Sequence, residues 1–206
     1  AVGPAVRADG EFAANRIKEM IFMFEKQRKL FVDIDGTLAV WQVGTPYEEL
    51  LKPGYFRNLP AHESVVQAVR MLIAEEKELG FETYALSALM PGNPWAEEDK
   101  RVWLAEHLPE LAASRMIFCE PGANKAGIVS EKFGRIHRGF VLLDDYSENL
   151  HAWEQAGGKG IKLRNGINGT KGTWNGLIAS RFASPEHTEI QILRALGLWL
   201  VKSGAL

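Results

Sequence analysis

The stretch FVDIDGTLAV, residues 31–40, ends an apolar run with two aspartates and then a glycine. Such a run, interrupted at Gly36, predicts a short buried strand followed by a sharp turn. Asp33 and Asp35 stand one residue apart, where like charges repel each other unless a cation or a proton compensates them. The groups that the rest of the chain brings to this strand end therefore decide its chemistry.

Strand and helix patterns alternate along the chain after residue 30. The apolar runs that predict strands are LFVDI, FETYALSA, MIFCE, GFVLLDD and GIKLR. Amphipathic segments separate them, and the strand runs lack a clean polar alternation, which is typical of parallel strands buried on both faces. We expect an α/β fold, a doubly wound parallel sheet with helices on both faces, and ligand binding at the carboxyl ends of its strands.

The 206 residues are predicted to form a single domain. A helical extension is expected over residues 1–29, before the first strand. Residues 41–60 hold three prolines and two glycines, which predict a loop with at most one helical turn. Ser184, Pro185 and Glu186 form an N-cap, a first-turn proline and an acidic first turn, so a C-terminal helix is expected over 184–203.

Composition excludes several classes of function. The net charge of −2 gives no polybasic footprint, so neither nucleic acid nor an anionic membrane is an expected partner. The single cysteine, Cys119, allows no internal disulfide framework. The first residues lack the apolar core of a secretory signal, and the longest apolar stretches are too short to span a membrane. A cytoplasmic location is expected, and the oligomeric state stays open.

Polar side chains end or follow the predicted strands, and parallel strands bring them to one edge of the sheet. They are Asp33, Asp35, Ser87, Lys125, Asp144 and Asp145. Two like charges about 4 Å apart repel by about 4 kcal/mol at an effective dielectric of about 20. A hard divalent cation would offset this repulsion, and Mg²⁺ suits carboxylates together with a substrate phosphate.

Each group can be given a chemical task. Asp33 can act as a nucleophile toward a phosphoryl group, and Lys125 with the metal would offset the repulsion between the two anions. Strand alternation places Asp35 on the same side, where it can protonate the leaving oxygen and later take a proton from water. Gly36 permits the turn that brings backbone amides near the phosphate, and Ser87 can donate to a phosphoryl oxygen.

The pair Asp144 and Asp145 would complete the metal site. Asp145 is expected to be a ligand, with Asp144 a second ligand or a group that orients the site. The alternative for the pair is capping of the helix that SENL begins, which can hold at the same time.

These residues resemble the four motifs of the haloacid dehalogenase-like hydrolases over roughly residues 30–165: DIDGT after a strand, a serine at the second strand end, an isolated lysine, and LLDD at a later strand. The resemblance implies a Mg²⁺-dependent phosphatase. It makes Asp33 the nucleophile and a metal ligand, and Asp35 the acid/base and a ligand through its backbone carbonyl. It makes Asp145 the direct carboxylate ligand.

A narrower likeness concerns the segments LKPGYFRNLPAHESVVQAVRML and YALSALMPGNPWAEEDKRVWLAEHLPEL. Their layout is similar to that of the 5'(3')-deoxyribonucleotidases, which implies a (deoxy)nucleoside monophosphate as the small-molecule substrate. That family carries a larger helical cap, whereas only residues 39–60 are free for one here, so a reduced cap and an open site are expected. The alternatives are a phosphatase of a larger or different substrate, such as a macromolecule end, a protein or a sugar phosphate, and a non-catalytic binding protein of the same fold.

Two further features have competing interpretations. The aromatic side chains Trp41, Phe56 and Trp95 follow the first two strands and can stack on a base at the mouth of the site, or pack among the loops. The glycine-rich segment 157–176 suggests a phosphate grip but fits no known phosphate loop, so a strand with surface turns is favoured. The five histidines show no metal-ligand spacing.

Overall fold

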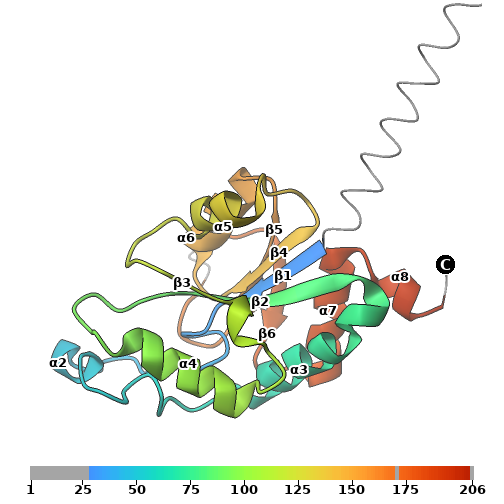
Figure 1. The fold of residues 1–206 in the computed structure, drawn as a ribbon. Coiled ribbons are helices and arrows are strands. Elements are labelled where there is room, and N and C mark those ends of the chain that lie inside the picture. The colour runs from blue at the N-terminus through green and yellow to red at the C-terminus, as the bar shows by residue number, and fades with distance from the viewer. Residues whose placement is uncertain (1–27, 170–171, 205–206) are drawn as a thin grey trace, which may run out of the picture.

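A computed structural model describes residues 28–169 and 172–204, and within them the chain forms one six-stranded sheet (Figure 1). The strands are β1 (Arg28–Val32), β2 (Phe81–Ala88), β3 (Met116–Cys119), β4 (Phe140–Asp144), β5 (Lys159–Arg164) and β6 (Leu177–Ser180). Their order is β3-β2-β1-β4-β5-β6, and every neighbouring pair is parallel. The predicted α/β class and doubly wound sheet are confirmed.

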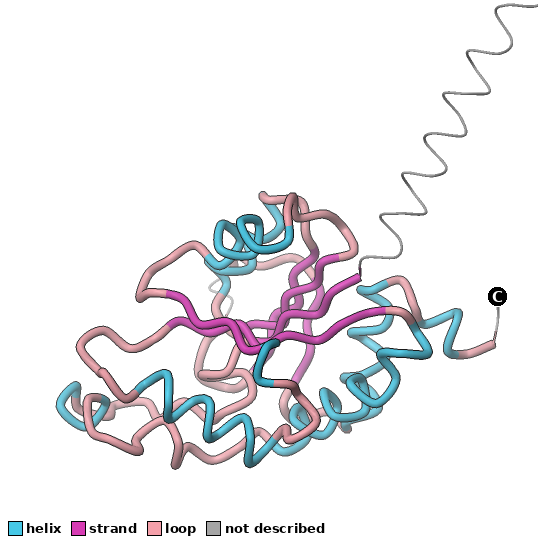
Figure 2. The backbone as a smooth tube through the Cα atoms, in the orientation of Figure 1, coloured by secondary structure: helices cyan, strands magenta, loops and turns pink. Residues whose placement is uncertain are grey.

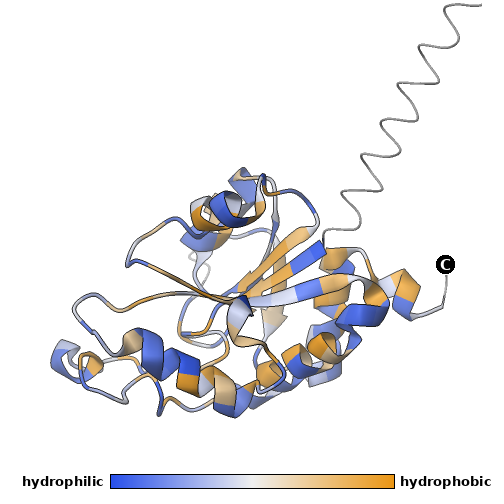
Figure 3. Cartoon of the chain, in the orientation of Figure 1, coloured by the Kyte–Doolittle hydropathy of each residue, from blue (hydrophilic) through white to orange (hydrophobic). Residues whose placement is uncertain are grey.

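Helices cover both faces of the sheet (Figures 1 and 2). On one face lie α3 (Glu63–Leu79), α4 (Ala96–His107) and α7 (Pro185–Leu196), and on the other α5 (Lys125–Phe133) and α6 (Ser147–Gln155). Successive side chains of a strand point to opposite faces, so Val32 belongs to the first core and Phe31 to the second. Strand β4 is accordingly hydrophobic along most of its length, whereas β2 and the helices are mixed (Figure 3).

Several element ends follow from local sequence. Gly80 ends α3 in the left-handed conformation, and the Ser184 side chain accepts a hydrogen bond from the His187 amide at the start of α7. The C-terminal helix predicted over 184–203 is instead two helices. Gly197, at φ 74°, ends α7, and α8 (Trp199–Lys202) begins two residues later.

The structure describes little of the predicted N-terminal extension and most of the glycine-rich segment. The helical extension predicted for residues 1–29 lies outside the described residues except for its last two, which belong to β1. The glycine-rich segment 157–176 provides β5 and the connection to β6, a short edge strand that the sequence does not predict.

Residues 39–60, the predicted reduced cap, contain the short helix α2 (Tyr47–Leu50) and a series of turns. This segment is fastened to α4: the Gly54 amide donates to Asp99 Oδ1 at 3.1 Å, and the Trp103 indole donates to the Leu59 carbonyl at 2.8 Å. Among the described helices, which also include a 3₁₀ turn at Ala113–Arg115, none has the length and apolarity needed to cross a membrane.

The strand order determines where a site can form. From β1 the chain proceeds to β2 and β3 on one side, whereas β4, β5 and β6 lie on the other. The order therefore reverses between β1 and β4, and ligands of such sheets bind outside the carboxyl ends of the strands at this point.

Candidate active site

The predicted site residues converge at the reversal point. Val32 pairs with Leu143, so Asp33, just after β1, lies beside Asp144, the last residue of β4. A pocket of about 860 Å³ opens there. All of the predicted site residues except Gly36 line it, namely Asp33, Asp35, Trp41, Ser87, Lys125, Asp144 and Asp145.

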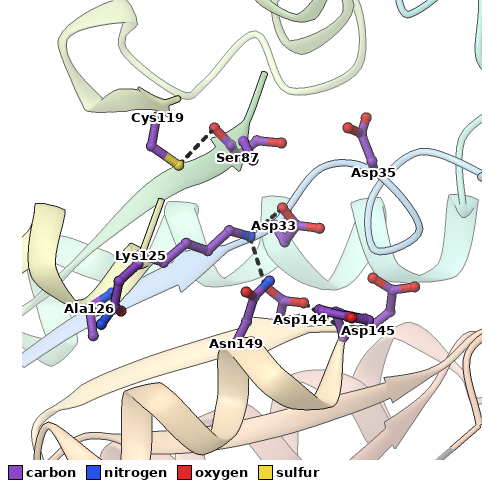
Figure 4. A network of polar contacts seen from close by, with 12 residues as sticks. Asp33, Asp35, Ser87, Cys119, Lys125, Ala126, Asp144, Asp145 and Asn149 are labelled. Carbon is purple, nitrogen blue, oxygen red and sulfur yellow. Dashed lines mark hydrogen bonds and ion pairs between the residues drawn. The ribbon is translucent and has the colours of Figure 1, made fainter. Parts of the chain in front are cut away.

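Lys125 is held between two carboxylates (Figure 4). It is the first residue of α5, whose N-cap Asn124 accepts a hydrogen bond from the Ala126 amide. Its ammonium donates to Asp33 Oδ1 at 2.6 Å and to Asp144 Oδ2 at 2.7 Å. Burial alone lowers the pKa of this lysine, but the charges of Asp144 and Asp33 outweigh it and the pKa is raised. Lys125 therefore stays a cation.

Three carboxylates crowd together beside that cation. Oxygen atoms of Asp33, Asp144 and Asp145 all lie within 4.8 Å of one another, and all three residues are buried. Burial raises the pKa of Asp33 to about 8, and Asp144 adds to the rise while Lys125 opposes it. Burial and the neighbouring Asp144 raise the pKa of Asp145 to about 6. Oxygen ligands that resist ionisation together are a donor set that fits a hard divalent cation.

The two adjacent aspartates differ in which oxygens are already bonded. Asp144 Oδ1 accepts from the Tyr146 amide at 2.7 Å, and Oδ2 accepts from Lys125 and from Asn149 Nδ2 at 3.0 Å. Tyr146 is the N-cap residue of α6, and this helix has no side-chain cap hydrogen bond, so the capping alternative for the pair is wrong. Both oxygens of Asp144 are thus engaged by protein donors, which suits a group that orients the site.

Asp145 has one bonded and one open oxygen. Its Oδ2 accepts from Asn165 Nδ2 at 2.7 Å and from Asn168 Nδ2 at 2.6 Å, whereas no described residue donates to Oδ1. Its backbone carbonyl accepts from the buried Lys162. Asp33 Oδ2 likewise receives no hydrogen bond from the described residues. Within the cluster of three carboxylates, these two oxygens are the ones left for a metal or a substrate, and Asp35 Oδ1 outside the cluster also has no hydrogen-bond partner among the described residues.

Gly36 fits its position for two reasons. Its φ of 80° lies in the left-handed region, where other residues are strained. A Cβ atom at this position would also collide with the Asp145 carboxylate. The Gly36 carbonyl accepts from Asn165 at 2.8 Å, so this turn and Asp145 share one donor. Gly36 does not line the pocket, and it supports the site by making room for Asp145.

Asp35 and Ser87 stand apart from the carboxylate cluster (Figure 4). A residue that the sequence does not predict joins them. Lys100 of α4 donates to Asp35 Oδ2 at 2.6 Å and to Ser87 Oγ at 3.0 Å. Its position was readable, because Lys100 precedes Trp103 and Leu104 by three and four residues and so shares their buried helix face. The side chain of Asp35 is 21% exposed, and that of Lys100 is buried.

Three asparagines that donate to the clustered aspartates could not be predicted from a pattern in the sequence. Asn165 and Asn168 lie in the glycine-rich segment 157–176, and only the fold brings them to Asp145. Asn149 reaches Asp144 from α6 in the same way.

The three aromatic side chains that were candidates for base stacking lie in three different environments. Trp41 lines the pocket and also packs against the first core, so its position agrees with both interpretations. Phe56 is 2% exposed and belongs to the core, which agrees with the loop-packing alternative. Trp95 is half exposed and does not line the pocket. Val43 and Tyr146 contribute further exposed apolar surface at the mouth.

Comparison with protein-family models and with curated protein sequences found no match for this chain. Solved structures do resemble it. The D,D-heptose 1,7-bisphosphate phosphatase from B. bronchiseptica, complexed with magnesium and phosphate, aligns with a TM-score of 0.54 and 13% identity, over 81% of this chain and 98% of its own. The D,D-heptose 1,7-bisphosphate phosphatase from Burkholderia Thailandensis aligns with a TM-score of 0.51 and 11% identity over the same shares. At these identities the likeness establishes a shared fold.

Proposed function

We propose that the protein is a Mg²⁺-dependent phosphomonoesterase that works through an aspartyl-phosphate. One observation carries this proposal: in a single pocket, Asp33 has one oxygen bound by the buried Lys125 and the other open, beside two further buried carboxylates. This arrangement orients a carboxylate nucleophile and supplies a cation for a phosphoryl group. The structural neighbour that contains magnesium and phosphate supports the same chemistry.

The open oxygen of Asp33 attacks phosphorus, and the bond from phosphorus to the leaving oxygen breaks as Asp35 gives that oxygen a proton. A water oxygen then attacks the phosphorus of the aspartyl-phosphate and gives a proton to Asp35. The bond between Asp33 and phosphorus breaks, and inorganic phosphate leaves. Ser87 donates its hydroxyl hydrogen to a phosphoryl oxygen, and Lys125 offsets the negative charge that accumulates in the transition state.

The proposed metal ligands are the open carboxylate oxygen of Asp145 and the Asp33 oxygen that also accepts from Lys125, with the backbone carbonyl of Asp35 as the resemblance implies. The open oxygen of Asp33 is then left for phosphorus. Asp144 orients Lys125 and so contributes indirectly, since both its oxygens accept from protein donors. When bound, Mg²⁺ supplies positive charge that favours the ionised carboxylates and reduces their repulsion with a phosphate.

The proposed substrate is a (deoxy)nucleoside monophosphate. Trp41 lines the pocket and presents a flat apolar surface on which a base can stack. Lys125 is the only lysine or arginine among the described residues that line the pocket, and Glu148 adds a further carboxylate. A second phosphate group on the substrate would therefore lack a cationic partner there.

A sugar phosphate is the second candidate substrate, because both structural neighbours are sugar bisphosphate phosphatases. The two candidates differ in the leaving group, so a panel of phosphomonoesters distinguishes them. The panel contains nucleoside 5′- and 3′-monophosphates, a sugar monophosphate and a sugar bisphosphate, each assayed with Mg²⁺ and with a chelator. We expect Mg²⁺-dependent hydrolysis with the highest kcat/KM for a nucleoside monophosphate.

The variant Asp33→Asn tests the nucleophile within the same panel. It should abolish hydrolysis of p-nitrophenyl phosphate and of the best natural ester, and the folded state is checked by circular dichroism. Full activity in this variant would contradict the assignment of Asp33. Binding without hydrolysis by the unaltered protein would instead favour the non-catalytic alternative.

A further inference from the structure

Lys100 is a fully buried lysine that ends beside the candidate active site. Its ammonium donates to Asp35 Oδ2 at 2.6 Å, to Ser87 Oγ at 3.0 Å and to the Ala88 carbonyl at 2.5 Å. It also lies 4.9 Å from the centroid of the Phe56 ring. An ammonium has three hydrogens to donate, and these contacts use all three. Lys100 does not line the pocket, so it acts on the substrate only through its neighbours.

The contacts of Lys100 join groups that come from different strands. Asp35 follows β1, and Ser87 lies near the end of β2. Since Ser87 Oγ accepts from the ammonium, the hydroxyl keeps its own hydrogen for another acceptor. The carboxylate of Asp35 is only partly exposed and has one oxygen fixed by a charge-assisted hydrogen bond. A single cation thus sets the orientation of two groups that face the pocket.

The site contains a second buried lysine with different partners. Lys125 is bound to Asp33 and Asp144, whereas Lys100 is bound to Asp35. The nucleophile and the acid/base group therefore each have an ammonium of their own. This division means that a change at Lys100 alters the surroundings of Asp35 and leaves the ion pair of Asp33 in place.

We propose that Lys100 is a positioning residue, which aligns the Asp35 carboxylate with the leaving oxygen and directs the Ser87 hydroxyl toward the phosphoryl group. This role rests on the proposed phosphatase function, in which the proton of Asp35 passes to the leaving oxygen as its bond to phosphorus breaks. Helix α4, which carries Lys100, is also hydrogen-bonded to residues 39–60 through Asp99 and Trp103. The same helix therefore contacts both that segment and Asp35.

Two substrates that differ in the need for a proton test this role. An alkyl phosphate releases an alkoxide that must be protonated, whereas p-nitrophenyl phosphate releases a stable anion that needs no proton. In Lys100→Met we expect kcat/KM to fall about 100-fold for the alkyl ester and about 10-fold or less for the aryl ester, since general acid catalysis contributes about 10²–10⁴-fold. A defect in packing alone would lower both values equally. The matched control Arg101→Met alters an exposed neighbour on the same helix and should leave both values unchanged.

A double-mutant cycle with Asp35→Asn keeps the test valid if Lys100→Met folds poorly, because the double variant removes both buried charges together. If Lys100 acts through Asp35, adding Lys100→Met to Asp35→Asn should change the ratio of the two kcat/KM values by less than twofold. An equal loss with both esters, no loss with either, or a full additional effect in the Asp35→Asn background would overturn the positioning role. Failure of the unaltered protein to hydrolyse either ester with Mg²⁺ would refute the proposed function first, and this role with it.

Discussion

Replacing Asp33 by asparagine is expected to make the metal-free protein more stable at neutral and basic pH. Burial raises the pKa of Asp33 from 3.8 to about 8 in the folded chain, even though Lys125 opposes the rise. One pH unit corresponds to about 1.4 kcal/mol, so the ionised carboxylate costs the folded state about 6 kcal/mol once the pH exceeds 8. Asparagine removes this cost, and Lys125 keeps its ion pair with Asp144.

The stability difference between Asp33→Asn and the unaltered protein should depend on pH in a defined direction. Between pH 4 and pH 8 the folded state holds the proton on Asp33 and the unfolded state does not, so the free energy of unfolding falls as the pH rises. The advantage of Asp33→Asn over the unaltered protein should therefore be absent near pH 4 and grow to several kcal/mol at pH 8. Urea unfolding in the presence of a chelator, followed by tryptophan fluorescence, measures this difference.

Replacing Asp145 by asparagine should give a smaller gain in stability than replacing Asp33. The pKa of Asp145 is raised from 3.8 to about 6, which corresponds to about 3 kcal/mol, so Asp145→Asn should show about half the gain and reach it at lower pH. Added Mg²⁺ should stabilise the unaltered protein at pH 8 and have little effect on Asp33→Asn. The reasoning fails if the stability difference between Asp33→Asn and the unaltered protein does not change between pH 5 and pH 8.

Three other changes have expected outcomes. Gly36→Ala strains the left-handed turn and displaces the Asp145 carboxylate, so it should cost about 1–3 kcal/mol in urea unfolding and most of the Mg²⁺-dependent activity. Lys125→Met leaves two buried carboxylates without their cation and should lower the free energy of unfolding by about 3–5 kcal/mol. Trp41→Ala should raise KM for a nucleoside monophosphate and leave KM for p-nitrophenyl phosphate within about twofold, as base stacking contributes about 1–3 kcal/mol.

The fold was predictable because its determinants are local and repeated. Apolar runs of strand length alternate with amphipathic helices, and this pattern specifies a parallel sheet without knowledge of any long-range contact. The short strand β6 was not predicted because it has only four residues, is only partly buried and directly follows the glycine-rich segment, whose composition favours turns. Gly197 was a visible helix stop, and the pattern of apolar residues on both sides of it concealed the break.

The candidate site was predictable to the extent that its residues follow strand ends. Asp33, Asp144 and Lys125 converge because parallel strands share one carboxyl edge, which is a topological consequence. Asn165 and Asn168 come from an irregular connection, whose path depends on packing rather than on periodicity. Lys100 lies between these cases, since its helix face was readable but its partner Asp35 was not.

The cost of clustering the carboxylates also explains why a metal requirement is expected of this site. With a pKa of about 8, Asp33 would be largely protonated at pH 7 in the metal-free protein, and a protonated carboxyl group is a poor nucleophile. A cation bound by Asp33 and Asp145 would lower both pKa values and so create the attacking carboxylate. The destabilisation that Asp33→Asn relieves and the metal dependence of the proposed reaction therefore have one physical origin, and a substitution that removes the first must also remove the second.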